Sequence, residues 1–256
     1  MQGVKTRRLE AERRAVLRNH FSAFAEAFQA YRSPDTRRSA ELDQSPHLLD
    51  LAMMSEFRDI LDVPEGADLS ILDDSDAMRA KFDAASTTWR EDCKNQLTAM
   101  VRQSLAVPDD ISDPLTLAMA LFSCDSCGRG NLTYPGVVSH ICLRSNIVCS
   151  VETYVSTAKT YWHPTTLRSP WSISPVSVSD DGIALMRPIL EACGLDPDRA
   201  THQDVENCAA QIICTGCSRS TYKTMQDGEW TSYKRYDVHT CKDAVSIISL
   251  FMCAHH

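Results

Sequence analysis

Apolar residues near the start of the chain recur at helical spacing. From residue 17 to residue 31 they alternate steps of four and three, which places them on one stripe of a helix that Pro34 ends. The members of this stripe are Leu17, Phe21, Phe24, Phe28 and Tyr31. Because a coiled coil needs sustained heptads, the pattern favours packing of this helix on its own domain.

Two further helices are predicted in the same half of the chain. Ser45 followed by Pro46 is typical of an N-cap and a first-turn proline, ahead of an apolar run that continues to residue 61. Apolar residues then recur at helical spacing over 82–101. Cys93 belongs to this second stripe, so we expect its thiol to be buried in a core.

The segments around and beyond residue 120 are more varied. Asp113 with Pro114 predicts the start of a short helix, LTLAMALF, that leads into a cysteine pair. The stretch 151–178 is rich in Ser, Thr, Val, Tyr and Trp and contains several prolines, which predicts short strands or an extended loop. A helix is predicted over 180–193, with Gly194 as its left-handed C-terminal cap.

Composition places the chain among ordinary globular proteins. It has 256 residues, of which 43% are hydrophobic and 23% charged, as expected for one or two domains. No stretch reaches the roughly 18 apolar residues of a membrane span, so we expect no membrane insertion. The start of the sequence lacks the apolar run and cleavage site of a secretory signal, which favours the cytosol or nucleus.

The cysteines carry the main chemical signal. Eleven cysteines in an intracellular chain of this size favour metal binding over disulfides. Cys124 and Cys127 form a CxxC pair, and His140 and Cys142 follow as an HxC pair. Gly128 permits a tight turn after the first pair, while i and i+2 positions on an extended strand would present the second pair on one face. Four such ligands predict a closed tetrahedral zinc site.

The same arrangement occurs a second time. Cys214 and Cys217 form a CxxC pair, and His239 and Cys241 form an HxC pair. Sequential closure of each set needs shorter loops than crossed pairing between the sets, so we predict two separate zinc ions.

Other cysteines leave alternatives open. Cys149 and Cys208 lie close enough in sequence to substitute as ligands, and Cys208 is the stronger substitute at the second site. The alternative to metal binding is burial as plain thiols, which suits Cys93, Cys193 and Cys253 better than the paired residues.

Together these features predict an α+β protein. We expect a mainly helical region over 1–110 and a zinc-binding region over 111–256, in which two small ribbon- or knuckle-like β elements are bracketed by helices. Because the predicted ligands fill all four positions of each ion, the sites favour a structural role over catalysis. The sequence also lacks the HExxH, GxSxG, GxGxxG and GxxxxGK[ST] signatures, so we expect a noncatalytic protein-interaction module with a protein partner.

Nucleic-acid binding is the alternative. Trp230, Tyr233, Lys234 and Arg235 mix aromatic and cationic side chains between the second pairs of ligands, as a stacking surface would. The formal net charge of -8 argues against a general polyanion binder. The basic residues between positions 5 and 18 are interleaved with Glu10 and are typical of a solvated helix face.

Two segments carry a resemblance to a known group. The run DPLTLAMALFSCDSCGRGNLTYPGVVSHICL and the later ACGLDPDRATHQDVENC resemble a large group of proteins from mushroom-forming fungi (basidiomycetes), many of which carry an F-box ahead of this region. The likeness covers roughly residues 45–245, and its most specific pieces are FxCxxC, the YP before HxC, and GLDPDRAT. The predicted zinc ligands match residue by residue, and the stretch from Trp230 to His239 corresponds to a Trp-to-His stretch that is longer and altered here.

The resemblance implies a function at the level of a class. F-box proteins are adaptors that recruit targets to a ubiquitin ligase, and the region after the F-box would recognise those targets. No F-box-like segment with a Leu-Pro start precedes the first predicted helix. We therefore expect either a shortened form or a member of the group that lacks the ligase-binding part.

Overall fold

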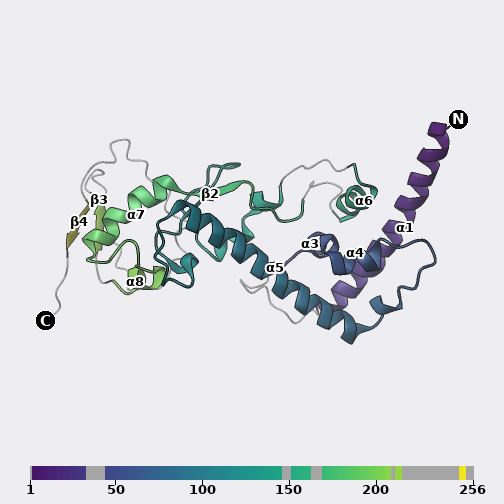
Figure 1. Ribbon diagram of the computed structural model, residues 1–256, viewed down its shortest axis with the longest axis horizontal. Coiled ribbons are helices and arrows are strands. Elements are labelled where there is room, and N and C mark those ends of the chain that lie inside the picture. The colour runs from purple at the N-terminus through teal and green to yellow at the C-terminus, as the bar shows by residue number, and fades with distance from the viewer. Residues whose placement is uncertain are drawn as a thin grey trace. The chain divides into compact units, whose positions relative to one another are not determined.

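The computed structural model describes residues 2–32, 44–145, 151–162, 169–208, 211–214 and 248–251. These residues form mostly helices and a few short strands, which confirms the predicted α+β class (Figure 1). The α-helices are α1 (Gln2–Tyr31), α3 (Leu48–Met53), α4 (Ser55–Leu61), α5 (Ser75–Ser104), α6 (Thr153–Trp162), α7 (Asp180–Ala192) and α8 (His202–Glu206). The 3-10 helices are η1 (Ser70–Leu72), η2 (Pro114–Thr116), η3 (Gly136–Ser139) and η4 (Ile141–Arg144). The strands are β1 (Phe122–Cys124), β2 (Val176–Val178), β3 (Gln211–Cys214) and β4 (Ile248–Phe251).

The chain divides into two compact units, each assembled from separate segments. Unit 1 comprises residues 1–97, 124–128 and 135–177, and unit 2 comprises the remaining segments, 98–123, 129–134 and 178–256. The predicted regions 1–110 and 111–256 stay a prediction.

Aromatic side chains form the core of unit 1. Phe21 of α1 packs edge-on against Tyr154 of α6, with ring centroids 5.3 Å apart. Phe24, also on α1, lies 5.1 Å from Phe57 of α4 and 5.6 Å from Phe82 of α5. The predicted stripe on α1 therefore packs within its own unit, because burial of these rings removes a large apolar area from water.

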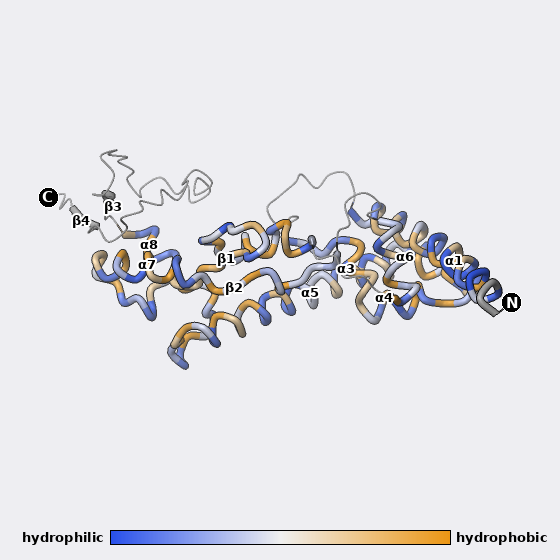
Figure 2. The backbone as a smooth tube through the Cα atoms, turned by 90° about the horizontal axis from the view of Figure 1, so that it is seen from above, coloured by the Kyte–Doolittle hydropathy of each residue, from blue (hydrophilic) through white to orange (hydrophobic). Residues whose placement is uncertain are grey.

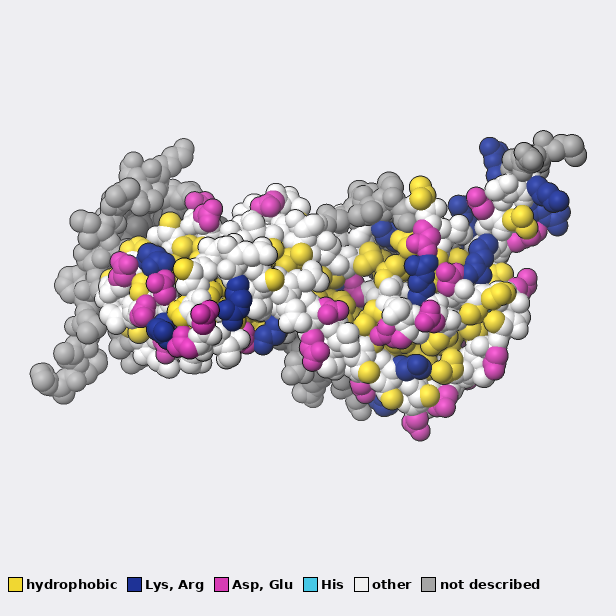
Figure 3. Space-filling view, in the orientation of Figure 1, with side chains coloured by type: hydrophobic (Ala, Val, Ile, Leu, Met, Phe, Trp, Pro, Cys, Tyr) yellow, Lys and Arg dark blue, Asp and Glu magenta, His cyan; other side chains and the backbone are white. Residues whose placement is uncertain are grey.

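The N-terminal half of α1 is different in character. Side chains from residue 5 to residue 12 are exposed, and Leu9 is 61% exposed. The tube is largely hydrophilic there, and dark blue cationic side chains gather over this part of the helix (Figures 2 and 3). The side chain of Arg8 pairs with Glu12 at 2.8 Å, as expected at i,i+4 spacing.

The apolar run that ends at residue 61 forms two helices where one was predicted. Met54 has φ -72° and ψ 142°, an extended conformation that separates α3 from α4. The N-cap of α3 is His47, so the predicted cap at Ser45 is wrong. The reason is local: the carboxylate of Asp50 accepts a hydrogen bond from the His47 backbone N–H at 2.7 Å, which fixes the start of the helix two residues later.

The predicted helix LTLAMALF is also wrong. Only η2 forms, with the side chain of Asp113 accepting a hydrogen bond from the backbone of Leu115 at 3.3 Å. The next residues pair with a distant segment: the N–H of Ala118 donates to the carbonyl of Ala200 at 2.8 Å. Tertiary hydrogen bonds therefore replace the intrahelical ones in this apolar stretch.

The stretch 151–178 combines a helix and a strand. The prediction of strands or loop is wrong over α6, where Tyr154 and Ala158 lie one turn apart and are 2% and 0% exposed. This i,i+4 pair buries one face of the helix and decides its structure. The prediction holds at β2, which forms a two-stranded sheet with β1.

Unit 2 is organised by α7 and α8. Leu190 of α7 and Val205 of α8 belong to one apolar cluster with Ala118, Met119 and Ala200. Gly194 follows α7 with φ +72°, which confirms the predicted left-handed cap.

The last described strands form a separate sheet. β3 pairs antiparallel with β4, with Gln211 opposite Phe251 and Cys214 opposite Ile248. Across the described ranges, each helix is too short or too polar to cross a membrane.

Candidate metal centre

The first predicted ligand set converges in unit 1. One donor atom from each of Cys124, Cys127, His140 and Cys142 lies within 4.8 Å of the others. The Sγ of Cys127 is 3.3 Å from the Nε2 of His140. A tetrahedral zinc ion with a Zn–S bond of about 2.3 Å and a Zn–N bond of about 2.0 Å places sulfur and nitrogen about 3.5 Å apart, close to this sulfur–nitrogen distance. The four side chains therefore form a cluster that could hold a metal ion.

A strand end and a tight turn position the first two ligands. Cys124 is the last residue of β1 and is 1% exposed, and its carbonyl accepts a hydrogen bond from the N–H of Gly128 at 2.8 Å. Gly128 has φ +69°, and a Cβ built there meets nothing within 4 Å. Glycine is therefore required for its backbone conformation and not for space. The N–H of Asp125 donates to the carbonyl of Pro175 at 2.8 Å and fixes the start of the turn.

The second pair is presented by 3-10 turns and not by the predicted strand. His140 is extended, with φ -65° and ψ 127°, but it lies between η3 and η4. Its N–H donates to the carbonyl of Val137, and its own carbonyl accepts from Leu143, both at 3.1 Å. Val137 and Leu143 are 0% exposed, so burial of these flanking apolar residues selects the turns over a strand.

The electrostatics of the cluster favour a cation. Burial, followed by the neighbouring thiols of Cys127 and Cys124, raises the pKa of Cys142 to about 11. Three thiolates in one place repel one another, and a divalent ion removes that repulsion because it binds the deprotonated forms. His140 is 9% exposed and Cys127 is exposed, so the cluster lies at the surface with one side covered.

A buried ion pair connects the cluster to the helices of unit 1. Arg144 is in η4, two residues after the ligand Cys142, and its guanidinium pairs with the carboxylate of Asp50 on α3. The two side chains are 9% and 2% exposed. Asp50 also accepts hydrogen bonds from the backbone N–H groups of His47 and Trp171, each at 2.7 Å. The carboxylate is therefore surrounded by three donors, as a buried charge requires.

Two tryptophans complete this connection. The guanidinium of Arg144 lies 5.6 Å from the ring centroid of Trp89, and Trp89 packs edge-on against Trp171 at 6.1 Å. The indole N–H of Trp171 donates to the carbonyl of Val138 in η3 at 3.2 Å. The turns that carry His140 and Cys142 are thus held by α3, α5 and the segment around residue 171.

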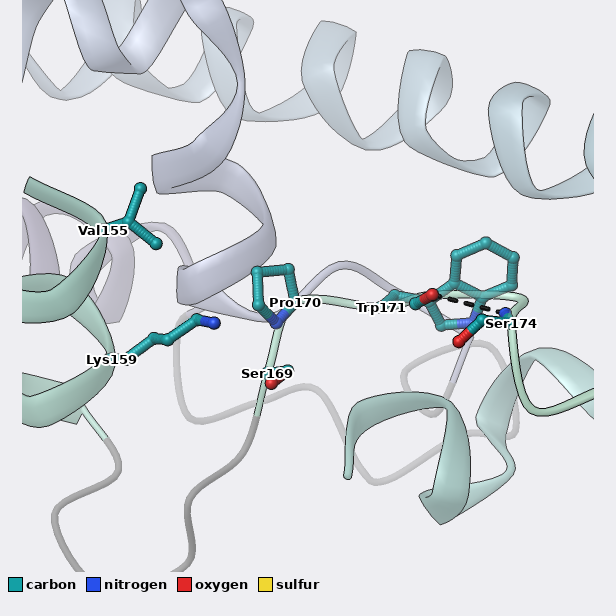
Figure 4. A pocket seen from close by; sticks show the side chains of 7 residues that line it. Val155, Lys159, Ser169, Pro170, Trp171 and Ser174 are labelled. Carbon is teal, nitrogen blue, oxygen red and sulfur yellow. Dashed lines mark hydrogen bonds between the residues drawn. The ribbon is translucent and has the colours of Figure 1, made fainter. Parts of the chain in front are cut away.

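Unit 1 also contains an open cavity next to this segment. Its volume is about 280 Å³ (Figure 4). It is lined by Val155 and Lys159 of α6 and by Ser169, Pro170, Trp171, Ser172 and Ser174. The N–H of Ser174 donates to the hydroxyl of Ser172 at 3.3 Å on its wall. Trp171 contributes to both the cavity and the Asp50 contacts, so the cavity borders the connection described above.

The second predicted site falls outside the described side chains. Cys217, His239 and Cys241 lie outside the described residues, and only the backbone of Cys214 is described, at the end of β3. The alternative ligand Cys149 and the residues predicted to contact nucleic acid (Trp230, Tyr233, Lys234 and Arg235) also lie outside. Two zinc ions therefore stay a prediction.

The sequence interpretation missed Asp50 and Arg144. A signal was present for both, since each is a charged residue in an apolar run, LLDLAMM and HICLR. Ionised residues are rarely fully buried unless they are paired, so two such residues predict a partner for each. Their mutual pairing could not be read from the sequence, because they are 94 positions apart.

No family model, curated protein or solved structure matches the chain.

Proposed function

We propose that Cys124, Cys127, His140 and Cys142 bind one zinc ion as a structural site. The observation that carries this proposal is the approach of four donors within 4.8 Å of one another. Three thiolates and an imidazole suit zinc, and together they occupy all four tetrahedral positions, which leaves no site for a substrate water. Structural zinc contributes about 10–16 kcal/mol of apparent binding energy in small fingers, comparable to the whole stability of a domain.

The zinc would act on folding through the turns. Cys142 and Arg144 share η4, so an ion that fixes Cys142 also fixes the guanidinium next to Asp50. Metal binding in the turns and helix packing in unit 1 then support each other, which is the role expected of a noncatalytic zinc site.

Metal analysis tests this part of the proposal. The purified chain should contain two zinc ions per molecule, or one if only the cluster in unit 1 binds. The variant Cys142→Ser should lose one ion and unfold at lower temperature. Cys193→Ser is the matched control, because Cys193 is also half-buried but lies outside the cluster. Equal zinc content and equal thermal stability in Cys142→Ser and the parent would sink the zinc assignment.

We further propose that the protein is a zinc-stabilised protein-interaction module. Ile141 supports this, since it lies between the ligands His140 and Cys142 and is 61% exposed. An exposed apolar side chain on a metal-bound turn offers a partner an apolar surface in a fixed position. The resemblance to F-box-associated proteins narrows the proposal to target recognition for a ubiquitin ligase.

Affinity capture with matched variants tests the interaction. A specific partner should bind the zinc-loaded chain, and Ile141→Asp should abolish that binding. Leu185→Asp is the control, because Leu185 is 51% exposed but lies on α7 in unit 2. If the chain captures no partner and instead shows zinc-dependent turnover of any substrate, the interaction proposal is wrong.

Nucleic-acid binding is the second candidate. The exposed cations on the N-terminal half of α1, among them Arg7 and Arg14, favour it. Binding through such residues weakens steeply with salt, because it depends on counterion release. Retention on single-stranded nucleic acid that is lost in Arg7→Gln/Arg14→Gln and falls with salt would support it, and a flat salt response would exclude it.

A further inference from the structure

Two cysteines outside the metal centre lie together in unit 2. Cys193 is the C-cap of α7, and its N–H donates to the carbonyl of Ile189 at 3.0 Å. Cys208 follows α8, and its N–H donates to the carbonyl of Val205 at 3.2 Å. Leu190 and Val205, each three residues before one of the cysteines, are buried in the same apolar cluster. The last turn of α7 and the turn after α8 therefore place both cysteines next to this apolar cluster.

The two thiols are in contact and accessible. The thiols of Cys193 and Cys208 lie close enough for Cys208 to influence the pKa of Cys193, and both residues are half-buried free cysteines. A disulfide needs Cβ atoms about 3.5–4.5 Å apart, so it forms between cysteines that already lie side by side. Among the described side chains, no third Cys, His, Asp or Glu joins this pair at metal-binding distance. The pair differs in this respect from the four-donor cluster in unit 1.

We propose that Cys193 and Cys208 form a reversible intramolecular disulfide, with glutathione disulfide as the oxidant. The Cys208 thiolate attacks one sulfur of glutathione disulfide, whose S–S bond breaks and releases one glutathione. Cys193 then loses its proton to solvent and attacks the sulfur of Cys208 in the mixed disulfide, which releases the second glutathione. The two protein thiols lose two electrons and two protons, and one glutathione disulfide becomes two glutathione molecules.

The environment of Cys193 sets the order of these steps. Burial, followed by its contact with Cys208, raises the pKa of Cys193 to about 11. Its thiol therefore stays protonated near neutral pH and is a poor first nucleophile, because the thiolate is the reactive form. Cys208 makes the first attack, and Cys193 resolves the mixed disulfide.

Peptide mapping tests the proposal on the full zinc-loaded chain. The chain is incubated with mixtures of reduced and oxidised glutathione, free thiols are blocked with N-ethylmaleimide, and the protein is digested with trypsin. Arg199 lies between the two cysteines, so trypsin separates them unless a disulfide joins them. We expect a joined peptide whose fragment ions place the bond between Cys193 and Cys208, and which dithiothreitol separates.

Variants and a parallel zinc measurement sharpen the result. Cys193→Ser should accumulate glutathione on Cys208, whereas Cys208→Ser should leave Cys193 largely unmodified. Far-UV circular dichroism checks that both variants fold, and unchanged zinc content shows that the ligands in unit 1 are not the residues oxidised. Labelling of both thiols by N-ethylmaleimide under oxidising conditions overturns the proposal, as does a bond from Cys208 to Cys214 or Cys217.

Discussion

Separating Asp50 from Arg144 should destabilise the chain far more than breaking an exposed ion pair. The perturbation is a double-mutant cycle with Asp50→Asn, Arg144→Met and the double variant. The side chains are 2% and 9% exposed, so neither charge finds solvent when its partner is removed. Removing one partner of such a pair costs about 3–5 kcal/mol.

The magnitude follows from the contacts of the carboxylate. Asp50→Asn leaves the Arg144 guanidinium buried without its counter-charge, and we expect a loss of about 4 kcal/mol. Arg144→Met leaves a carboxylate that still accepts from His47 and Trp171, so a loss of about 3 kcal/mol is expected. The double variant carries no buried charge but leaves one of those N–H groups weakly paired. We expect it to lose about 1–3 kcal/mol of unfolding free energy. The coupling energy expected from these three values is therefore about 4–6 kcal/mol.

Urea denaturation in the presence of zinc measures the unfolding free energy of the parent and of each variant. Circular dichroism follows the helices, and tryptophan fluorescence reports on Trp89 and Trp171 beside the pair. Arg187 and Asp198 form the control pair, with a distance of 3.0 Å and exposures of 44% and 53%. Their coupling should be about 0.2–1 kcal/mol because solvent screens both charges. If the Asp50–Arg144 coupling is no larger than that of the control pair, the buried pair does not hold the turns to the helices.

Three further predictions follow from single side chains. Removal of zinc with a chelator should lower the melting temperature of the parent by more than that of Cys142→Ser, which lacks the ion in unit 1, as calorimetry would show. Burial, followed by the charge of Asp50, raises the pKa of Cys93 to about 12, so N-ethylmaleimide at about pH 8 should label this thiol only in denaturant; labelling of the native chain at a normal rate would contradict this. Burial lowers the pKa of His202, whose Nε2 finds no hydrogen-bond partner among the described residues. The imidazole of His202 therefore binds a proton more tightly in the unfolded chain than in the folded one, so the unfolding free energy should fall as the pH drops below about 6.5. The variant His202→Gln should show a smaller fall, measured as the urea midpoint at a series of acidic pH values.

The sequence predicted the helices whose apolar faces are long and regular. The stripe on α1 and the stripe that includes Cys93 are both helical and buried, because many side chains at one spacing agree on one face. Short apolar runs were less informative. The run LTLAMALF fits a helical pattern, yet the backbone N–H of Ala118 donates a hydrogen bond to the carbonyl of the distant Ala200. Helix propensity describes only local hydrogen bonds, so it could not predict this long-range one.

The sequence by itself determined the chemistry of the metal centre. Residue type made Cys124, Cys127, His140 and Cys142 candidate metal donors, and the glycine after the first pair fixed its turn at φ +69°. These features depend only on neighbours in the chain, so the sequence contains them in full.

The tertiary structure alone decided which distant groups meet. It brought Arg144 to Asp50 across 94 positions, set His140 and Cys142 on 3-10 turns, and placed Cys193 against Cys208. The physical reason is that buried charges and polar groups must find partners wherever packing leaves them, and packing is a property of the whole unit. A local pattern shows that Asp50 and Arg144 each need a partner, and only the folded chain shows that they are partners of each other.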